Sequence, residues 1–350
     1  MHVAARTGDK LLTNTILVTG AAGQVGSRLV HRLVAAGRDV RALVLPNDPN
    51  IGRLEGLEID MQEGNVLDET VAASAVNGVD AIVHAANLLG PLPGMSPNEF
   101  FQNNVQSTYN IAYEAAQTAA TIDRLVYISS SAVYPNGAHK VAPAYNPIDE
   151  IHPLRPLGSY AASKVASEHL IDALGRESGL EYSIVRPSGV LSGSAPLDRC
   201  TVGFYASILR AGGRHPEGTL YLEGERDLAA ELETAAPATD IPCAITDEQG
   251  RPWLDQPVHV NDLVHGIRCA LEHPAAVGEA FNIAAPRREP APRTAELHAD
   301  KTGKPVFSWE APVRWIFDLE VSKAKEQISY EPTWDFERMV GEAWANQATT

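Results

Sequence analysis

Cysteine is scarce in this sequence, and other features that mark particular classes of protein are missing. The 350 residues include three cysteines, none of them in a CxxC pair. This excludes a disulfide framework and a structural zinc site, and it predicts a reducing, cytoplasmic location. No apolar run approaches the roughly 20 residues that a membrane span needs. No HExxH or HxH cluster occurs, so no metal site is expected.

Positive charge is also in short supply. Lysine and arginine total 28 against 44 acidic residues, a formal net charge of −16. Such a surface repels phosphate backbones, so nucleic acid is not an expected partner. Hydrophobic residues make up 44% and charged residues 21%, as in ordinary globular proteins. The length predicts one large domain or two medium ones. Residues 1–14 are charged, lack an apolar core segment, and are predicted to be a flexible tail rather than a signal peptide.

Short apolar runs alternate with helical spacing through the first half of the chain. Strands are predicted at 15–19, 40–45, 59–64, 81–85, 125–129 and 182–186, and helices at 24–36, 68–77, 98–120 and 159–178. Strands that alternate with helices form parallel βαβ units. The predicted fold class is therefore α/β, a doubly wound parallel sheet of the Rossmann type, with a smaller C-terminal substrate-binding domain.

A glycine-rich segment links the first predicted strand to the first predicted helix. Gly20, Gly23 and Gly26 lie in TGAAGQVGS. Glycines there allow a tight turn and the close approach of a pyrophosphate, and the helix N-terminus attracts the anion. The spacing predicts a dinucleotide-binding loop.

The end of the second predicted strand bears on which dinucleotide binds. An acid there favours NAD and an arginine favours NADP, but the strand ends in Val44 and Leu45. Asp48 could reach back from the following loop, whereas Arg28 or Arg41 would favour NADP. The sequence therefore favours NAD and leaves NADP open.

Tyr160 and Lys164 form the second candidate site. A spacing of four places both side chains on one helix face. A nearby ammonium favours a phenolate, so this pair predicts a lowered tyrosine pKa and proton transfer during hydride transfer. Ser129, Ser130 and Ser131 follow the fifth predicted strand at its carboxyl end, where ligands bind in such sheets. No GxSxG motif surrounds them, which disfavours a hydrolase.

The regular alternation of predicted strands and helices ends after Pro187. Residues 15–186 are assigned to the dinucleotide-binding domain, with 261–283 returning to it, and residues 187–260 and 284–338 to the substrate-binding part. Residues 339–350 are interpreted as a second tail. The acid-rich stretch 223–257 is interpreted as an insertion, and a solvated surface excursion is favoured over a lid or an oligomer contact. Trp253 within it is a less favoured candidate to cap the substrate pocket.

Taken together, these motifs resemble the extended short-chain dehydrogenase/reductase family, in the branch of NAD-dependent epimerases and dehydratases. Further matching segments are EGNVLD (63–68), VHAAN (83–87), NNVQSTYNIAYEAA (103–116), PVHVNDL (257–263) and GEAFNIA (278–284). The resemblance implies that Tyr160 is the acid/base, that Lys164 assists it and holds the nicotinamide ribose, and that Ser130 is the catalytic hydroxyl.

The resemblance also implies a cofactor site and an oligomer. The cofactor-binding residues are expected to be Gly20, Gly23, Gln24, Val25, Gly26, Asn65, Val66, Ala85, Ala86, Asn104, Tyr160, Lys164 and Pro187. The helices at 98–117 and 159–174 are expected to pair in a homodimer.

Some positions depart from the family pattern. Ser131 and Ala132 replace the acidic pair of the dehydratases, which disfavours dehydration. Gly189 stands where nucleotide-sugar enzymes often carry asparagine. No arginine is assigned to a substrate pyrophosphate; the candidates are Arg214, Arg287 and Arg314.

The predicted function is NAD(P)-dependent hydride transfer at a secondary alcohol or ketone carbon of a sugar or sugar derivative. Epimerase and dehydrogenase both stay open. A non-catalytic dinucleotide-binding sensor or scaffold is the alternative. The expected partner is a small-molecule substrate, with no membrane and no nucleic acid.

Overall fold

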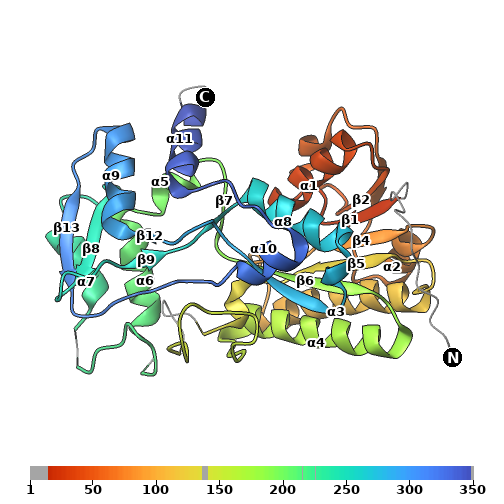
Figure 1. Cartoon of the computed structure of the whole chain (residues 1–350), viewed down its shortest axis with the longest axis horizontal. Helices are drawn as coiled ribbons and strands as arrows, with labels where there is room; N and C mark the ends of the chain where they lie inside the picture. The colour runs from red at the N-terminus through yellow and green to blue at the C-terminus, as the bar shows by residue number, and fades with distance from the viewer. Residues whose placement is uncertain (1–14, 136–140, 215, 225, 348–350) are drawn as a thin grey trace.

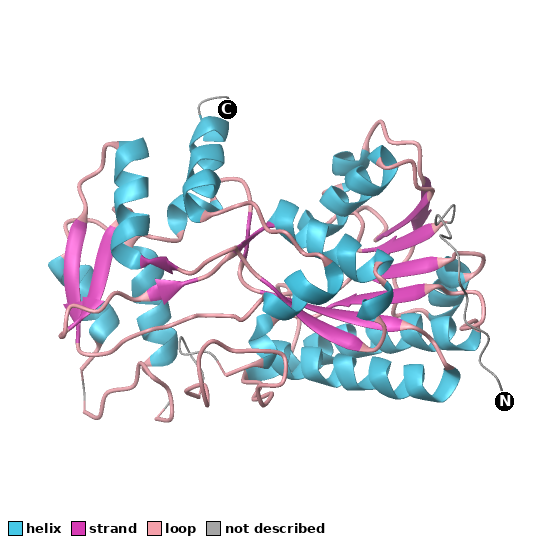
Figure 2. Ribbon diagram, viewed as in Figure 1, coloured by secondary structure: helices cyan, strands magenta, loops and turns pink. Residues whose placement is uncertain are grey.

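A seven-stranded parallel sheet forms one half of the molecule (Figures 1 and 2). The computed structural model describes residues 15–135, 141–214, 216–224 and 226–347. The strand order is β11-β6-β5-β4-β1-β2-β3. The strands are β1 (Ile16–Thr19), β2 (Val40–Val44), β3 (Asp60–Glu63), β4 (Ala81–His84), β5 (Arg124–Ile128), β6 (Tyr182–Pro187) and β11 (Glu279–Ile283). The doubly wound parallel sheet expected from the sequence is confirmed.

Helices cover both faces of this sheet, which is why its central strands are continuously apolar (Figure 1). On one face the core includes residues of α1, α8 and α10, and on the other face residues of α2, α3 and α4. These helices are α1 (Gln24–Ala35), α2 (Glu69–Val76), α3 (Pro97–Gln117), α4 (Gly158–Ser178), α8 (Val260–Glu272) and α10 (Ser322–Ile328).

Two long helices, α3 and α4, run side by side along the sheet (Figure 1). Helix α3 begins with a capping box, in which Ser96 and Glu99 each accept from the other's backbone N–H. Helix α4 ends where Gly179 adopts the left-handed conformation. α4 begins near the carboxyl edge of the sheet, so its first turns lie beside the end of β5.

The second half of the molecule has its own apolar core and small two-stranded sheets. Its helices are α5 (Ala195–Asp198), α6 (Val202–Gly212), α7 (Leu228–Ala235), α9 (Ala291–Thr302) and α11 (Phe336–Gln347). Its strands are β7 (Val190–Leu191), β8 (Cys243–Asp247), β9 (Leu254–Asp255), β10 (Val258–His259), β12 (Glu289–Pro290) and β13 (Phe307–Ala311). Strands β8 and β13 pair in parallel, and α6 packs on α7.

The acid-rich stretch 223–257 is not the surface excursion that the sequence suggested. It contains α7 and β8, and Leu232 and Ile245 are buried in the core of the second half. Two of its acids support the local structure: Asp227 caps α7, and Asp247 accepts from the backbone of Arg251. The prediction rested on the number of acids and overlooked the apolar residues between them. The spacing of those apolar residues makes this segment part of the core.

The C-terminal segment also differs from the expectation. Residues 339–350 were expected to form a tail, but α11 extends to Gln347. Met339, Val340 and Ala343 on α11 are buried. Residues 348–350 and the expected N-terminal tail 1–14 lie outside the described residues. No described helix is both long enough and apolar enough to cross a bilayer.

Candidate active site

The glycine loop joins β1 to α1 and brings backbone unusually close to backbone. Gly20 has φ +64°, and a Cβ there would lie 2.9 Å from the Cα of Ala86. A Cβ on Gly26 would lie 2.2 Å from the carbonyl oxygen of Gly20. Only glycine fits these positions. The loop leaves the N-terminus of α1 open toward a pocket, and a pyrophosphate fits such a cradle.

A pocket of about 490 Å³ extends from this loop across the carboxyl edge of the sheet into the second half of the molecule. Ten of the residues expected from the sequence line it. They are Gly20, Gly23, Gln24, Val25, Gly26, Ala85, Ser130, Tyr160, Lys164 and Pro187. Residues from five separate segments of the chain therefore meet at one surface, as open α/β sheets require of a ligand site.

Four other expected residues do not line this pocket. The side chain of Asn65 accepts from the N–H of Leu67 in a local turn, and Val66 is buried in the core. Ala86 packs against Gly20. Asn104 on α3 donates to Leu88 O (2.9 Å) and accepts from its N–H (2.9 Å). Asn104 thus holds the loop that follows β4, a supporting position rather than a contact.

Tyr160 and Lys164 lie one turn apart on α4, facing the end of β5. Lys164 is 3% exposed. Its Nζ donates to Ile128 O (2.7 Å) and to Asn87 Oδ1 (3.1 Å). An ammonium has three donor hydrogens, so one is left for a ligand. The Ser130 side chain lies within reach of the Tyr160 phenol and also accepts from Ala132 N (3.1 Å).

The electrostatics of this pair differ from the expected lowered tyrosine pKa. Burial raises the pKa of Tyr160, and the hydrogen bond with Ser130 only partly offsets that. Burial also lowers the pKa of Lys164 to about 7, against a raising influence of Glu168. Because burial favours the uncharged amine, Lys164 is a weak electrostatic partner for the phenol.

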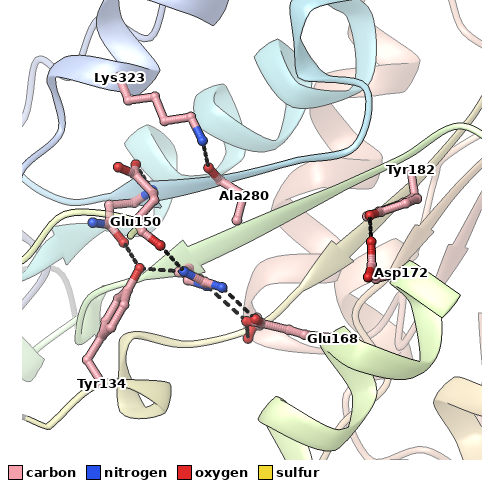
Figure 3. Close-up of polar contacts among 10 residues, drawn as sticks. Tyr134, Glu150, Glu168, Asp172, Tyr182, Ala280 and Lys323 are labelled. Carbon is pink, nitrogen blue, oxygen red and sulfur yellow. Dashed lines mark hydrogen bonds and ion pairs between the residues drawn. The ribbon is translucent and has the colours of Figure 1, made fainter. Parts of the chain in front are cut away.

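A buried polar network braces the site from behind, and Figure 3 draws its centre. Ser129 Oγ donates a hydrogen bond to Glu168. The same carboxylate accepts hydrogen bonds from Arg186 Nε (3.1 Å) and Nη2 (2.7 Å). Arg186 Nη1 donates to the hydroxyl of Tyr134 (2.7 Å), and that hydroxyl donates to Asn282 Oδ1 (2.9 Å). The network ties the serine strand end, β6 and β11 to the helix that carries Tyr160.

None of the side chains considered for choosing between NAD and NADP lines the pocket, and two of them make contacts elsewhere. Arg41 pairs with Asp60 (2.7 Å) and donates to carbonyls near the end of α2. Asp48 accepts from the backbone of Asn50 (2.9 Å). Arg28, like these two, does not line the pocket.

The candidate pyrophosphate arginines do not line the pocket either. Arg287 pairs with Glu289 (2.6 Å) and Asp335 (3.3 Å). Arg314 donates to Pro252 O (3.1 Å), and Arg214 is exposed.

Trp253 does not cap the pocket, in contrast to the sequence-based suggestion. It is fully buried, and its Nε1 donates to Val313 O (3.0 Å). Trp315 packs against it edge to face and lines the pocket instead.

The second half contributes lining residues that sequence reasoning missed. These are Arg199, Phe204, Ile208, Trp315 and Phe317. Phe204 and Ile208 lie four residues apart on α6, a weak signal of a shared face, and nothing in the sequence links them to Trp315. Asn87, which also lines the pocket, could have been predicted from the sequence, because it is the last residue of the VHAAN segment. Among the described residues no group of three metal-ligating side chains comes together.

Comparisons with known proteins agree with this geometry. The model of the NAD dependent epimerase/dehydratase family matches residues 16–284. The UDP-glucose 4-epimerase of Azospirillum brasilense is 31% identical over 192 residues, which cover 53% of this chain and 51% of that protein. The sterol demethylase protein B of Methylococcus capsulatus is 32% identical over 181 residues, covering 51% and 52%. The chain thus spans about half the length of these curated relatives.

A solved structure matches more of the chain. It is a short-chain dehydrogenase/reductase superfamily protein from Agrobacterium tumefaciens with bound NAD. Its sequence is 25% identical, its TM-score is 0.77, and the match covers 96% of this chain and 97% of that one. The whole architecture, including the second half, is therefore shared with a protein that holds a dinucleotide.

Proposed function

This chain belongs to the NAD dependent epimerase/dehydratase family, and from that premise we propose that it moves a hydride at a secondary alcohol or ketone carbon, with Tyr160 as the acid/base. NAD is the proposed cofactor, and when bound it supplies the hydride acceptor. The presence of NAD in the Agrobacterium structure supports this choice. A sugar or sugar derivative, expected from the sequence, is the starting hypothesis for the substrate, and the Azospirillum relative is a UDP-glucose 4-epimerase.

The chain's own residues have distinct parts in this proposal. Gly20, Gly23 and Gly26 let the pyrophosphate approach the N-terminus of α1. Ser130 donates a hydrogen bond to the reacting oxygen, and Tyr160 takes or gives its proton. Lys164 offers its remaining donor hydrogen to the nicotinamide ribose. An ammonium held there would also favour the phenolate form of Tyr160.

One observation carries the proposal: Tyr160, Ser130 and the glycine loop line the same pocket. A scaffold protein needs a pyrophosphate-binding loop to hold a dinucleotide, but it does not need a proton-transfer group in the same pocket. Their meeting supports a reaction in which a proton and a hydride leave or reach the same carbon–oxygen group.

The first experiment identifies the nucleotide that the purified protein carries. The protein is denatured, and the released compound is identified by mass spectrometry. Near-stoichiometric NAD or NADH supports an epimerase that recycles its cofactor in place. An empty protein that binds NADH on titration supports a dehydrogenase or reductase. A protein that binds neither form contradicts the proposal.

The second experiment replaces the acid/base. Tyr160→Phe removes only the hydroxyl, so turnover is expected to fall by about 100-fold or more while NADH affinity is kept. Tyr221→Phe is the matched control, because Tyr221 is partly exposed and lies outside the pocket. Full activity of Tyr160→Phe would contradict the assignment of Tyr160. NADH binding without turnover of any alcohol or ketone would favour the sensor.

We also propose that the protein is a homodimer paired through α3 and α4. Tyr109 and Tyr113 stack on each other on the outer side of α3 and are both partly exposed. Light scattering during size-exclusion chromatography measures the mass. Tyr113→Glu is expected to shift a dimer toward monomer, and a monomeric parent protein would contradict the proposal.

A further inference from the structure

The pocket wall opposite the glycine loop is built from large apolar side chains. Phe204 and Ile208 on α6 face the pocket together with Trp315 and Phe317. The rings of Phe204 and Trp315 have centroids 6.2 Å apart, and those of Trp315 and Phe317 lie 6.4 Å apart. The wall is continuous with the core of the second half, so its rings are held from behind by packing. Such a surface binds through the apolar area that it removes from water.

The cation on the apolar side of this pocket is already paired with an acid. Among the described lining residues only Lys164 and Arg199 are cationic. Arg199 Nε donates to Asp255 Oδ2 (2.6 Å) and Nη2 to Oδ1 (3.0 Å), a bidentate pair that is largely buried. The guanidinium also lies 5.0 Å from the ring centroid of Phe204. Arg199 and Asp255 together carry no net charge.

The position of Arg199 depends on the absence of a side chain at Gly189. A Cβ at Gly189 would lie 2.7 Å from Arg199 Nη1. The guanidinium therefore occupies space at the pocket wall beside β7, and Asp255 holds it there. A substrate diphosphate brought to this wall would lose its water without gaining an unpaired cation, which is costly for a group with two negative charges.

We propose that the substrate is an uncharged secondary alcohol or ketone with an apolar ring or chain that packs on Phe204, Trp315 and Phe317, and that the Arg199–Asp255 pair disfavours nucleotide diphosphate sugars. This inference rests on the proposed function, because the substrate that it describes would occupy the pocket beside Tyr160. The proposed substrate class is therefore neutral and more apolar than the sugar derivative that the sequence suggested.

The first test measures the binding of two ketones by isothermal titration calorimetry. The protein is loaded with oxidised NAD, which has no hydride to give to a ketone, so that the heat reports binding alone. Cyclohexanone and 4-phenylcyclohexanone share the reacting group and differ in apolar area. The larger ketone is expected to bind about tenfold or more tightly, and UDP-glucose is expected to bind more weakly than either. Tighter binding of UDP-glucose than of 4-phenylcyclohexanone overturns the inference, and so does equal affinity for the two ketones.

A pair of variants tests the wall itself. Phe204→Ala is expected to remove most of the affinity gained by the larger ketone and to leave NADH affinity unchanged. Phe101→Ala is the matched control, because Phe101 lies on α3 outside the pocket. An unchanged ratio between the two ketones in Phe204→Ala overturns the inference.

A second variant pair tests the exclusion of anions. Asp255→Asn leaves Arg199 with an unpaired charge, so affinity for UDP-glucose is expected to rise by about tenfold. Asp247→Asn is the control: Asp247 is buried and paired with Arg251 (2.7 Å) on β8, away from the pocket. No gain in Asp255→Asn overturns the charge argument. Where that variant does not fold, the ketone series and Phe204→Ala decide.

Failure of the proposed function gives a different pattern from failure of this inference. A protein that binds no NADH contradicts both. A protein that binds NADH and prefers UDP-glucose to the ketones keeps the proposed function and loses only the substrate class.

Discussion

The two walls of the pocket are built in opposite ways. One wall, proposed to bind the cofactor and called the cofactor wall, combines the glycine loop at the junction of β1 and α1 with short segments at the ends of β4, β5 and β6 and the first turns of α4. The other wall, proposed to bind the substrate and called the substrate wall, consists of large rings from α6 and from the segment around Trp315. In the proposed function, the first wall binds the cofactor by close backbone approach, which leaves little freedom. The second recognises by apolar area, which has no preferred direction.

This difference also appears in how each wall is held. Behind Ser130 and Tyr160 stands a buried ion pair with directional hydrogen bonds, Glu168 with Arg186. Behind the substrate wall stand Trp253 and other core side chains in van der Waals contact. A directional support fails abruptly when one partner is lost, whereas packed rings tolerate small changes of shape. Substitutions are therefore expected to have larger effects on the cofactor side.

The largest effect is expected from Glu168→Gln. It leaves the buried guanidinium of Arg186 without a counter-charge, so the free energy of unfolding is expected to fall by about 3–5 kcal/mol. Urea denaturation measures this change. Glu233→Gln, in the exposed pair with Arg210 (2.8 Å), is the control and should be nearly silent. Equal stability of the two variants would mean that the cofactor side is not rigidly braced.

Next is Gly26→Ala, which adds one methyl group at the tightest point of the loop. A Cβ there would meet the Gly20 carbonyl oxygen at 2.2 Å, so the loop must open. A loss of about 1–3 kcal/mol in stability and at least about tenfold weaker NADH binding are expected. In Gly52→Ala the new methyl group meets nothing within 4 Å, and this variant should bind NADH normally. Normal NADH binding by Gly26→Ala would place the cofactor elsewhere.

A smaller, pH-dependent effect is expected from Lys164. Burial lowers its pKa from 10.5 to about 7. Between those pH values the unfolded chain holds a proton that the folded protein has released, so stability rises with pH. The slope contributed by this one group is at most about 1.4 kcal/mol per pH unit. The stability of the parent protein minus that of Lys164→Met, measured by denaturation from pH 7 to 10, should therefore increase. A flat difference would show that the folded protein keeps Lys164 charged.

The smallest effect is expected on the substrate wall. Ile208→Val removes one methylene from a partly buried side chain, at a cost of about 0.5–1.5 kcal/mol in stability. Binding of 4-phenylcyclohexanone should weaken slightly, and NADH binding should not change. Val277→Ala, on an exposed residue outside the pocket, serves as the control. A large loss of NADH binding in Ile208→Val would mean that the two walls are coupled.

The cofactor side was largely predictable because its pattern is local. Gly20, Gly23 and Gly26 follow a strand and open a helix, and Tyr160 and Lys164 are one helical turn apart. Glu168 lies one further turn along the same helix, but nothing in the sequence assigns Arg186 to it. The tyrosine pKa was predicted in the wrong direction, because spacing reveals which charges are near and not how much water is excluded.

The second half was less predictable. The acids of 223–257 suggested a solvated excursion, although Leu232 and Ile245 belong to a core there. Trp253 and Trp315 are both aromatic residues in this half, yet only Trp315 faces the pocket. Their roles depend on contacts between α6, β8 and the segment around residue 315, which are far apart in the chain.

The sequence by itself determined the fold class, the glycine loop and the tyrosine–lysine pair. Strands and helices have fixed periods, and a chain that forms them must display those periods locally. Only the tertiary structure decided which side chains form the wall that is proposed to meet the substrate. Apolar contact is non-directional and needs no fixed spacing, so the wall formed by Phe204, Trp315 and Phe317 leaves no local pattern. The same holds for the pairing of Arg199 with Asp255, since two charges can meet in the folded protein from any separation along the chain.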